Sequence, residues 1–231
     1  SAEATVAVMA VPRPVAHWPL HSEAYGVVDA AGQSNGVLES LSEPVWDDGL
    51  LFNGQMRVQI SPSGTLNYTL EGPFTVTAWI RAGPHHGCRV LSNRGDSGFE
   101  IVAPRTNSKK VTLWLGGEHR NIGLTDVDDN EWHHLVVTFK TSDDHSHVQV
   151  GLYVDGRWDL ASEEGERFDV RDTRPLASTA PMCIGDWKGH PGHGYEGHIR
   201  DVMIFQGLLS QDDVTAVHTA APSTVMTKAA H

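Results

Sequence analysis

One carboxylate stands where the sequence leaves little room for a charge. Asp201 lies in the strand-like segment 199–205, in which apolar residues occupy both faces beyond Arg200. A buried carboxylate without a partner either costs several kcal/mol or loses its charge. Hard divalent cations take oxygen ligands, and calcium often completes its shell with backbone carbonyl groups. The pattern therefore predicts calcium at Asp201, with a salt bridge to an arginine or a solvent-facing kink as the alternatives.

Paired carboxylates, which a glycosidase requires, do not occur in the strand-like segments. A retaining glycosidase places two carboxyl groups roughly 5–5.5 Å apart, which on one strand needs acidic residues at i and i+2 or i+4. Glu100 stands alone between two apolar residues, and the acidic run 163–166 has the composition of an exposed loop. The sequence contains no phosphate-binding loop or H-E-x-x-H motif. It therefore predicts a non-enzyme, with a glycan-active hydrolase or lyase as the less favoured alternative.

Histidine is abundant, with 14 in a chain of 231 residues. His145 and His147 would project from the same side of an extended segment, as a transition-metal pair does. Because the surrounding stretch is polar and turn-like, a solvated loop is the favoured interpretation of this pair. His133 falls on the inward face of its predicted strand, where we expect a hydrogen-bonded histidine of the core.

Alternation of apolar and polar residues identifies the elements that would position these groups. It recurs at 56–60, 74–81, 111–115, 133–139 and 148–154, with turn-forming residues between the segments. The last segment runs directly into Asp155-Gly156, a strong signal of a two-residue hairpin turn. Ser210 and Asp213 have the spacing of a capping box for one short C-terminal helix. Strands without intervening helices predict an all-β fold, an antiparallel sandwich.

Charge and length exclude several classes of function. The 17 Lys and Arg residues against 29 Asp and Glu residues give a net charge of −12. This charge repels phosphate backbones and anionic membranes, so we expect no nucleic-acid partner. No apolar run approaches the roughly 20 residues of a transmembrane helix, so we expect no membrane insertion. The length fits one soluble sandwich domain, since these often reach roughly 200–250 residues.

Several short motifs occur in a characteristic order. They are Phe52-Asn53-Gly54, 74–80, 90–93 with 98–100, Glu131-Trp132-His133-His134 continuing to 138, 152–156, Ile184-Gly185, 197–205 and 208–213. Together, over roughly residues 17–218, they resemble the laminin G-like and pentraxin family of concanavalin A-like jelly rolls. The resemblance implies an antiparallel jelly-roll β-sandwich. Members of this family mostly bind glycans or other extracellular ligands, often with calcium.

The resemblance also implies ligands for the predicted calcium. In this jelly-roll group, an aspartate at the place of Asp201 holds a structural calcium on the convex side, together with carbonyl groups of N-terminal strands. Here the resemblance points to Asn53 and Gly54 for that second strand and to Asp29 for a further oxygen.

A second site is implied on the rim. Asp96 and Asp186 lie where pentraxins bind their ligand through calcium, but 187–189 replaces the pentraxin acidic cluster with Trp-Lys-Gly. Two further calcium ions and phosphocholine binding are therefore not expected there. A sugar that stacks on Trp187 beside Asp186, His190 and Tyr195 is the predicted ligand. A tryptophan of the core is the alternative for Trp187.

Two further modifications are predicted. From the residues alone, Cys88 and Cys183 fit either one disulfide or two buried thiols. Both precede strands that meet near the same rim in the family, so the resemblance implies a disulfide between them. The sequon at Asn67 permits N-glycosylation, which suits a secreted glycoprotein.

These observations predict an N-terminal strand-like extension over 1–16, a jelly-roll domain over 17–218 and a tail over 219–231. The predicted function is a non-catalytic extracellular recognition module, lectin-like and calcium-stabilised, with a glycan or glycoprotein ligand. The alternative is a self-assembling structural or matrix subunit that forms homo-oligomers through its terminal segments.

Overall fold

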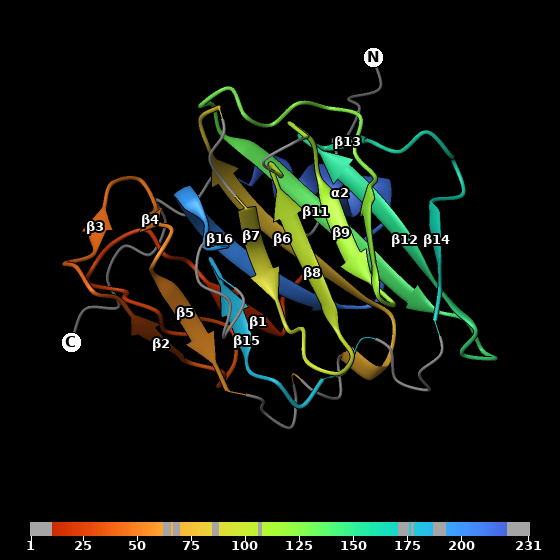
Figure 1. Ribbon diagram of the computed structural model, residues 1–231, viewed down its shortest axis with the longest axis horizontal. Helices are drawn as coiled ribbons and strands as arrows, with labels where there is room; N and C mark the ends of the chain where they lie inside the picture. Colours follow the sequence, from red (N-terminus) through yellow and green to blue (C-terminus); the bar gives the residue numbers. More distant parts are fainter. Residues whose placement is uncertain are drawn as a thin grey trace, which may run out of the picture.

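Two antiparallel sheets stack face to face in the computed structural model, with one short helix on the far side of one of them (Figure 1). The structure describes residues 11–61, 66, 70–84, 88–105, 108–170, 176, 178–186 and 193–220. The all-β jelly-roll sandwich predicted from the sequence is confirmed. Most of the predicted N-terminal extension and the tail after Ala220 lie outside the described residues.

The nine-stranded sheet contains β16, the longest strand of the described chain. Its order is β13 (Arg157–Trp158), β12 (His147–Val154), β11 (His133–Thr141), β6 (Phe74–Arg81), β16 (Glu196–Gln206), β4 (Leu50–Asn53) and β3 (Val45–Trp46). Two more strands join off this path, β1 (Ala16–Trp18) on β16 and β14 (Glu166–Asp169) on β12.

The seven-stranded sheet forms the other layer. Its order is β10 (Glu118–Asn121), β9 (Thr112–Leu115), β8 (Phe99–Ala103), β7 (Cys88–Ser92), β15 (Met182–Ile184), β5 (Arg57–Ile60) and β2 (Gly36–Glu39). Every neighbouring pair in this sheet is antiparallel.

The core lies between the sheets because alternate side chains of each strand point inward. Phe74 and Phe139 come from neighbouring strands of the nine-stranded sheet and stack with ring centroids 4.8 Å apart. Phe99 comes from the opposite sheet and lies 4.8 Å from Phe139. All three rings are fully buried, so this aromatic contact joins the two layers.

The strands predicted from alternation all form, with bounds within two residues of those expected. The hairpin turn is also confirmed, since Asp155 and Gly156 adopt φ values of +51° and +78° between β12 and β13. The strands β1 and β3 were not predicted because two or three residues are too few to show alternation.

The C-terminal helix α2 (Gln211–Thr219) has the predicted capping box. The Ser210 hydroxyl accepts a hydrogen bond from the Asp213 backbone N–H, and the Asp213 carboxylate accepts one from the Ser210 N–H. Val214 and Val217 pack against Val136 and other apolar side chains on the outer face of the nine-stranded sheet.

Strand β16 contains a bulge at Asp201. Its register against β6 shifts between Arg200 and Met203, and Asp201 adopts φ +48°. The Asp201 N–H donates to the Pro19 carbonyl at 2.9 Å, just beyond the end of β1. The bulge places the Asp201 carboxylate against the segment that follows β1.

The predicted core histidine is confirmed as a buried ion-paired group. His133 Nδ1 lies 2.8 Å from Asp155 and its Nε2 lies 3.1 Å from Asp129. The hydrogen bond to Asp155 outweighs burial and, with that to Asp129, raises the pKa of His133 to about 8. The imidazolium thus ties the start of β11 to the hairpin turn.

We predict that the free energy of unfolding falls as pH rises through 8. A raised pKa contributes stability that is fully present below 6.5, the ordinary value, and is lost as the folded protein deprotonates. The loss should be about 1–2 kcal/mol, allowing for solvent around the two carboxylates. Urea unfolding between about pH 6 and about pH 9 measures it.

His133→Gln removes the titrating group, so its stability should change less over that window. His145→Gln is the matched control, because His145 is exposed in a turn. Equal pH dependence in wild type and His133→Gln would contradict this account.

Candidate functional site

The outer face of the seven-stranded sheet carries interlocked charges. Because Phe99 and Ile101 point into the core, Glu100 between them points outward, yet its side chain is fully buried. Arg89 Nε donates to one carboxylate oxygen at 3.0 Å, and Arg94 Nη1 lies 3.5 Å from the other. Charge-assisted hydrogen bonds to two guanidinium groups hold this carboxylate in place.

The same face continues across β15, β5 and β2. Arg57 Nη1 donates to Asp186 at 3.2 Å, and Arg57 Nη2 donates to Glu39 at 2.5 Å. Asp186 follows β15 at the level of Arg89, since Ile184 pairs with Leu91 in an antiparallel register. We call Glu39, Arg57, Asp186, Arg89 and Glu100 the charge row.

An aromatic group lies at the β9 end of the charge row. The Arg94 guanidinium carbon lies 3.9 Å from the centroid of the Trp114 ring, and His119 meets the same ring edge-on at 6.5 Å. Burial lowers the pKa of His119, although the Glu100 charge opposes this effect. Indole, imidazole and guanidinium groups therefore share one corner of the sheet.

The carboxylates of the charge row are all ion-paired with arginine side chains. Glu100 is neutralised by Arg89 and Arg94, and Asp186 is paired with Arg57. The carboxylate oxygens that would act on a substrate are therefore already engaged by arginine side chains. Sequence analysis found Glu100 but not its partners, because the three residues meet only through strand pairing and a loop.

The predicted rim site is not assembled. Strands β7 and β15 are antiparallel, so the residues after them leave from opposite ends of the sheet. Asp96 follows β7 and is exposed, while Asp186 follows β15 and joins the charge row. The expectation that they share one site was therefore wrong.

The other predicted rim residues do not complete the site. Tyr195 is fully buried and contacts Phe52 edge-on at 6.3 Å, and burial raises the pKa of its hydroxyl. Its assignment as a ligand residue is corrected to a core residue. Trp187 and His190 lie outside the described residues, as does the glycosylation candidate Asn67.

The structure gives Asp201 histidine partners. His17 Nε2 lies 3.0 Å and His21 Nε2 3.1 Å from the same oxygen, Oδ1. Burial would raise the pKa of Asp201, but the two hydrogen bonds and the charges of the imidazoles outweigh it and lower the pKa. The partners of Asp201 are therefore histidines and not the predicted arginine. The predicted solvent-facing kink does not apply either, because Asp201 is only 2% exposed.

The residues predicted to share calcium with Asp201 do not fit that role. Asp29 accepts hydrogen bonds from the backbone N–H groups of His17, Ala31, Gly32 and Ser34, so its oxygens organise a loop.

Asn53 pairs with Glu196, five positions before Asp201 along β16, and Gly54 follows at the end of that strand pair. Calcium requires six to eight oxygen ligands, and this arrangement does not bring them together. The predicted ligand set was therefore wrong.

The Cys88–Cys183 disulfide is also corrected. Cys183 pairs with Ser92, and Cys88 lies four residues away along β7. Four residues of a strand span about 13 Å. The Cα atoms of Cys88 and Cys183 therefore lie farther apart than the roughly 7 Å that a disulfide can bridge. Both residues are thiols, and burial raises the pKa of Cys88.

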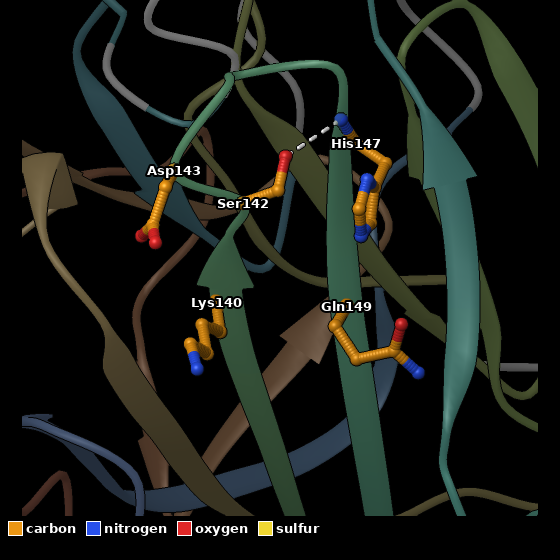
Figure 2. A pocket seen from close by; sticks show the side chains of 5 residues that line it. All are labelled: Lys140, Ser142, Asp143, His147 and Gln149. Carbon is orange, nitrogen blue, oxygen red and sulfur yellow. Dashed lines mark hydrogen bonds between the residues drawn. The ribbon is translucent and has the colours of Figure 1, made fainter.

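A second polar region lies at the β11–β12 hairpin. Figure 2 shows Lys140, Ser142, Asp143, His147 and Gln149 around an open cavity of about 360 Å³. The Ser142 hydroxyl accepts a hydrogen bond from the His147 backbone N–H at 3.2 Å. No Trp, Tyr or Phe among the described residues lines this cavity, so it lacks the large stacking surface that a sugar site uses.

Among the described residues, no three His, Cys, Asp or Glu side chains already form a metal site. No described helix is long and apolar enough to cross a membrane.

Comparison with known proteins agrees with the architecture. The family model Laminin_G_3, of the concanavalin A-like lectin/glucanases superfamily, matches residues 52–215. Calsyntenin-1 of Rattus norvegicus is 25% identical over 195 residues, which is 71% of this chain and 18% of that protein. Calsyntenin-1 of Danio rerio is 25% identical over 220 residues, which is 79% of this chain and 22% of that protein. The chain thus spans about a fifth of these relatives.

Solved structures share the fold at low sequence identity. Domain 4 of AbnA, a GH43 extracellular arabinanase from Geobacillus stearothermophilus in complex with arabinotriose, has a TM-score of 0.65 at 16% identity. The match covers 89% of this chain and 98% of that domain. The receptor binding domain of a botulinum neurotoxin C/D mosaic serotype has a TM-score of 0.62 at 14% identity, covering 89% of this chain and 51% of that one.

We predict that calcium removal leaves the thermal stability unchanged, because the oxygen ligands are not assembled around Asp201. The melting temperature in EDTA and in millimolar calcium should agree within about 1 °C. A drop of several degrees in EDTA that calcium reverses would restore the calcium assignment. Asp201→Asn should instead cost about 1.5–3 kcal/mol through weaker hydrogen bonds to His17 and His21, measured by urea unfolding.

Proposed function

Because this chain belongs to the concanavalin A-like lectin/glucanases superfamily, we propose that it is a non-catalytic module that recognises a glycan. The proposed site is the charge row together with Arg94, Trp114 and His119, on the outer face of the seven-stranded sheet. The observation that carries the proposal is the indole ring beside charged side chains that hold one another in place.

This arrangement has the two components of sugar recognition. The apolar face of a pyranose stacks on an aromatic ring, while its hydroxyl groups bond to convergent polar groups. The Arg94 side chain is 22% exposed and covers Trp114. Displacing it from the indole costs about 0.5–1 kcal/mol and leaves its guanidinium beside the sugar as a donor.

The accessible groups lie at both ends of the site. Glu39 and Arg57 are 40% and 27% exposed at one end, and His119 is 31% exposed at the other. Between them, Arg89 and Glu100 are buried and brace the exposed groups. Groups fixed by their neighbours lose little entropy on binding, which favours recognition.

The comparisons are consistent with binding. The arabinanase domain is described in complex with arabinotriose, and the neurotoxin domain is described as receptor binding. The non-catalytic part of the proposal depends on the arginine pairing of Glu100 and Asp186. We place the module outside the cell, the setting named for the arabinanase.

Self-association is a second candidate function, supported by a different observation. Strands β2 and β3 are the edges of their respective sheets, and Figure 1 shows both on one side of the molecule. Val37, Leu41 and Val45 are 60%, 89% and 48% exposed there. Open edges with apolar side chains favour pairing with another chain. Light scattering would reveal a concentration-dependent dimer that Leu41→Lys dissociates.

We predict saturable binding on a glycan array that EDTA does not abolish. Trp114→Ala and Arg57→Ala should each weaken binding of the strongest glycan about tenfold, through loss of stacking or of a charged donor. Lys140→Ala is the matched control, since Lys140 lies at the hairpin cavity and should leave binding unchanged.

Melting curves separate loss of binding from loss of folding, which matters because Trp114 is only 7% exposed. Glycan binding that survives both substitutions in folded protein would disprove this site. Equal loss in Lys140→Ala would move the site to the hairpin.

A further inference from the structure

A small cavity lies on the other face of the molecule, between α2, β16 and the segment before β1. Its volume is about 190 Å³, and its walls are mostly apolar, with Pro12, Pro14, Met203, Phe205 and Val217 among them. Asp201 and His17 supply polar groups. It is separate from the proposed glycan site, which lies on the opposite sheet.

One oxygen of the Asp201 carboxylate has no partner among the described residues. Oδ1 interacts with His17 and His21, whereas Oδ2 is buried and unbonded. Buried carboxylate oxygens almost always accept a hydrogen bond, because an unsatisfied one forfeits its hydration. Oδ2 therefore requires a donor.

The surrounding groups do not supply a fixed positive charge. His134 is buried nearby, and burial with the charge of His218 lowers its pKa to about 3, so it is neutral at pH 7. Both rings stack on Trp79. The Arg200 guanidinium carbon lies 4.0 Å from the Trp132 ring and 5.7 Å from the Trp79 ring, and its charge is paired with Asp48.

We propose that this cavity binds a primary alkylammonium group, with its N–H groups on Asp201 Oδ2 and its alkyl stem against Met203, Phe205 and Val217. The ligand is a small free amine or the end of a lysine side chain. An ammonium ion supplies both a charge and hydrogen-bond donors, whereas a quaternary ammonium lacks the donors. The apolar walls add no oxygen ligands, and the described residues form no metal site.

The size and polarity of the cavity match this class. Its volume is below the roughly 300 Å³ at which sites for drug-sized ligands begin, so it suits a fragment with a few carbon atoms. Burial strengthens the attraction between the ammonium and the carboxylate, since the local dielectric is lower than in water. Specificity for the charged end follows from the single unbonded oxygen.

The test is calorimetric titration of the whole chain with n-butylamine hydrochloride at neutral pH. Saturable binding is expected for n-butylamine, with n-butanol and tetramethylammonium binding at least about tenfold more weakly. n-Butanol has the alkyl stem without the charge, and tetramethylammonium has the charge without N–H donors. Equal binding of n-butanol would show only an apolar cavity and would overturn the proposal, as would absence of binding.

Asp201→Asn and Val217→Leu locate the ligand, and Glu163→Gln is their control. Asp201→Asn should abolish binding, and Glu163→Gln, which removes an exposed and distant carboxylate, should not. Because Asp201→Asn also affects folding, Val217→Leu provides a second test that keeps the carboxylate and narrows the cavity. Val217→Leu should weaken the binding of n-butylamine while leaving the circular dichroism spectrum of the protein unchanged. Undiminished binding in both variants would overturn the assignment.

A peptide with one lysine, compared with its acetylated form, distinguishes the two sources of the ammonium. Competition by the lysine peptide alone identifies a protein partner. Competition by neither peptide, with n-butylamine bound, identifies a small free amine.

Discussion

The bulge in β16 is the constraint on which the nine-stranded sheet depends. Strands β6, β4 and β1 all pair with β16, so any irregularity in it affects three neighbours. At Asp201 the backbone adopts a positive φ, which costs energy for a residue other than glycine. The N–H bond to Pro19 and the two histidine contacts offset that cost and fix where β1 pairs with the strand.

The sequence predicted those parts of the fold that depend on local pattern. The alternation of 74–81, the Asp155-Gly156 turn and the Ser210 capping box each need only neighbouring residues, and each is present. The environment of Asp201 was not predictable, because a bulge breaks the rule that successive side chains alternate between faces. A carboxylate between apolar residues signalled a buried charge but not its partners, which lie about 180 residues earlier.

The predictions of site residues were right or wrong for a related reason. Asp96 and Asp186 each follow a strand, but only the direction of pairing decides whether two such residues meet. The charge row depends on the pairing order of five strands, which no local pattern contains. Two members of the row stood out in the sequence, Glu100 between two apolar residues and Asp186 as a candidate ligand residue, but the sequence did not show their arginine partners.

The two sheets differ in how the oxygens of their buried carboxylates are bonded. Glu100 has a guanidinium group at each oxygen, so its charge is satisfied within the protein and it serves to orient Arg89 and Arg94. Asp201 has imidazoles at one oxygen only, and the other oxygen is buried beside an apolar cavity. A carboxylate bonded at both oxygens orients its neighbouring side chains, whereas one with an unbonded oxygen still has an acceptor for a donor. The same residue chemistry thus gives an interlocked set of ion pairs on one sheet and an unbonded carboxylate oxygen beside a small cavity on the other.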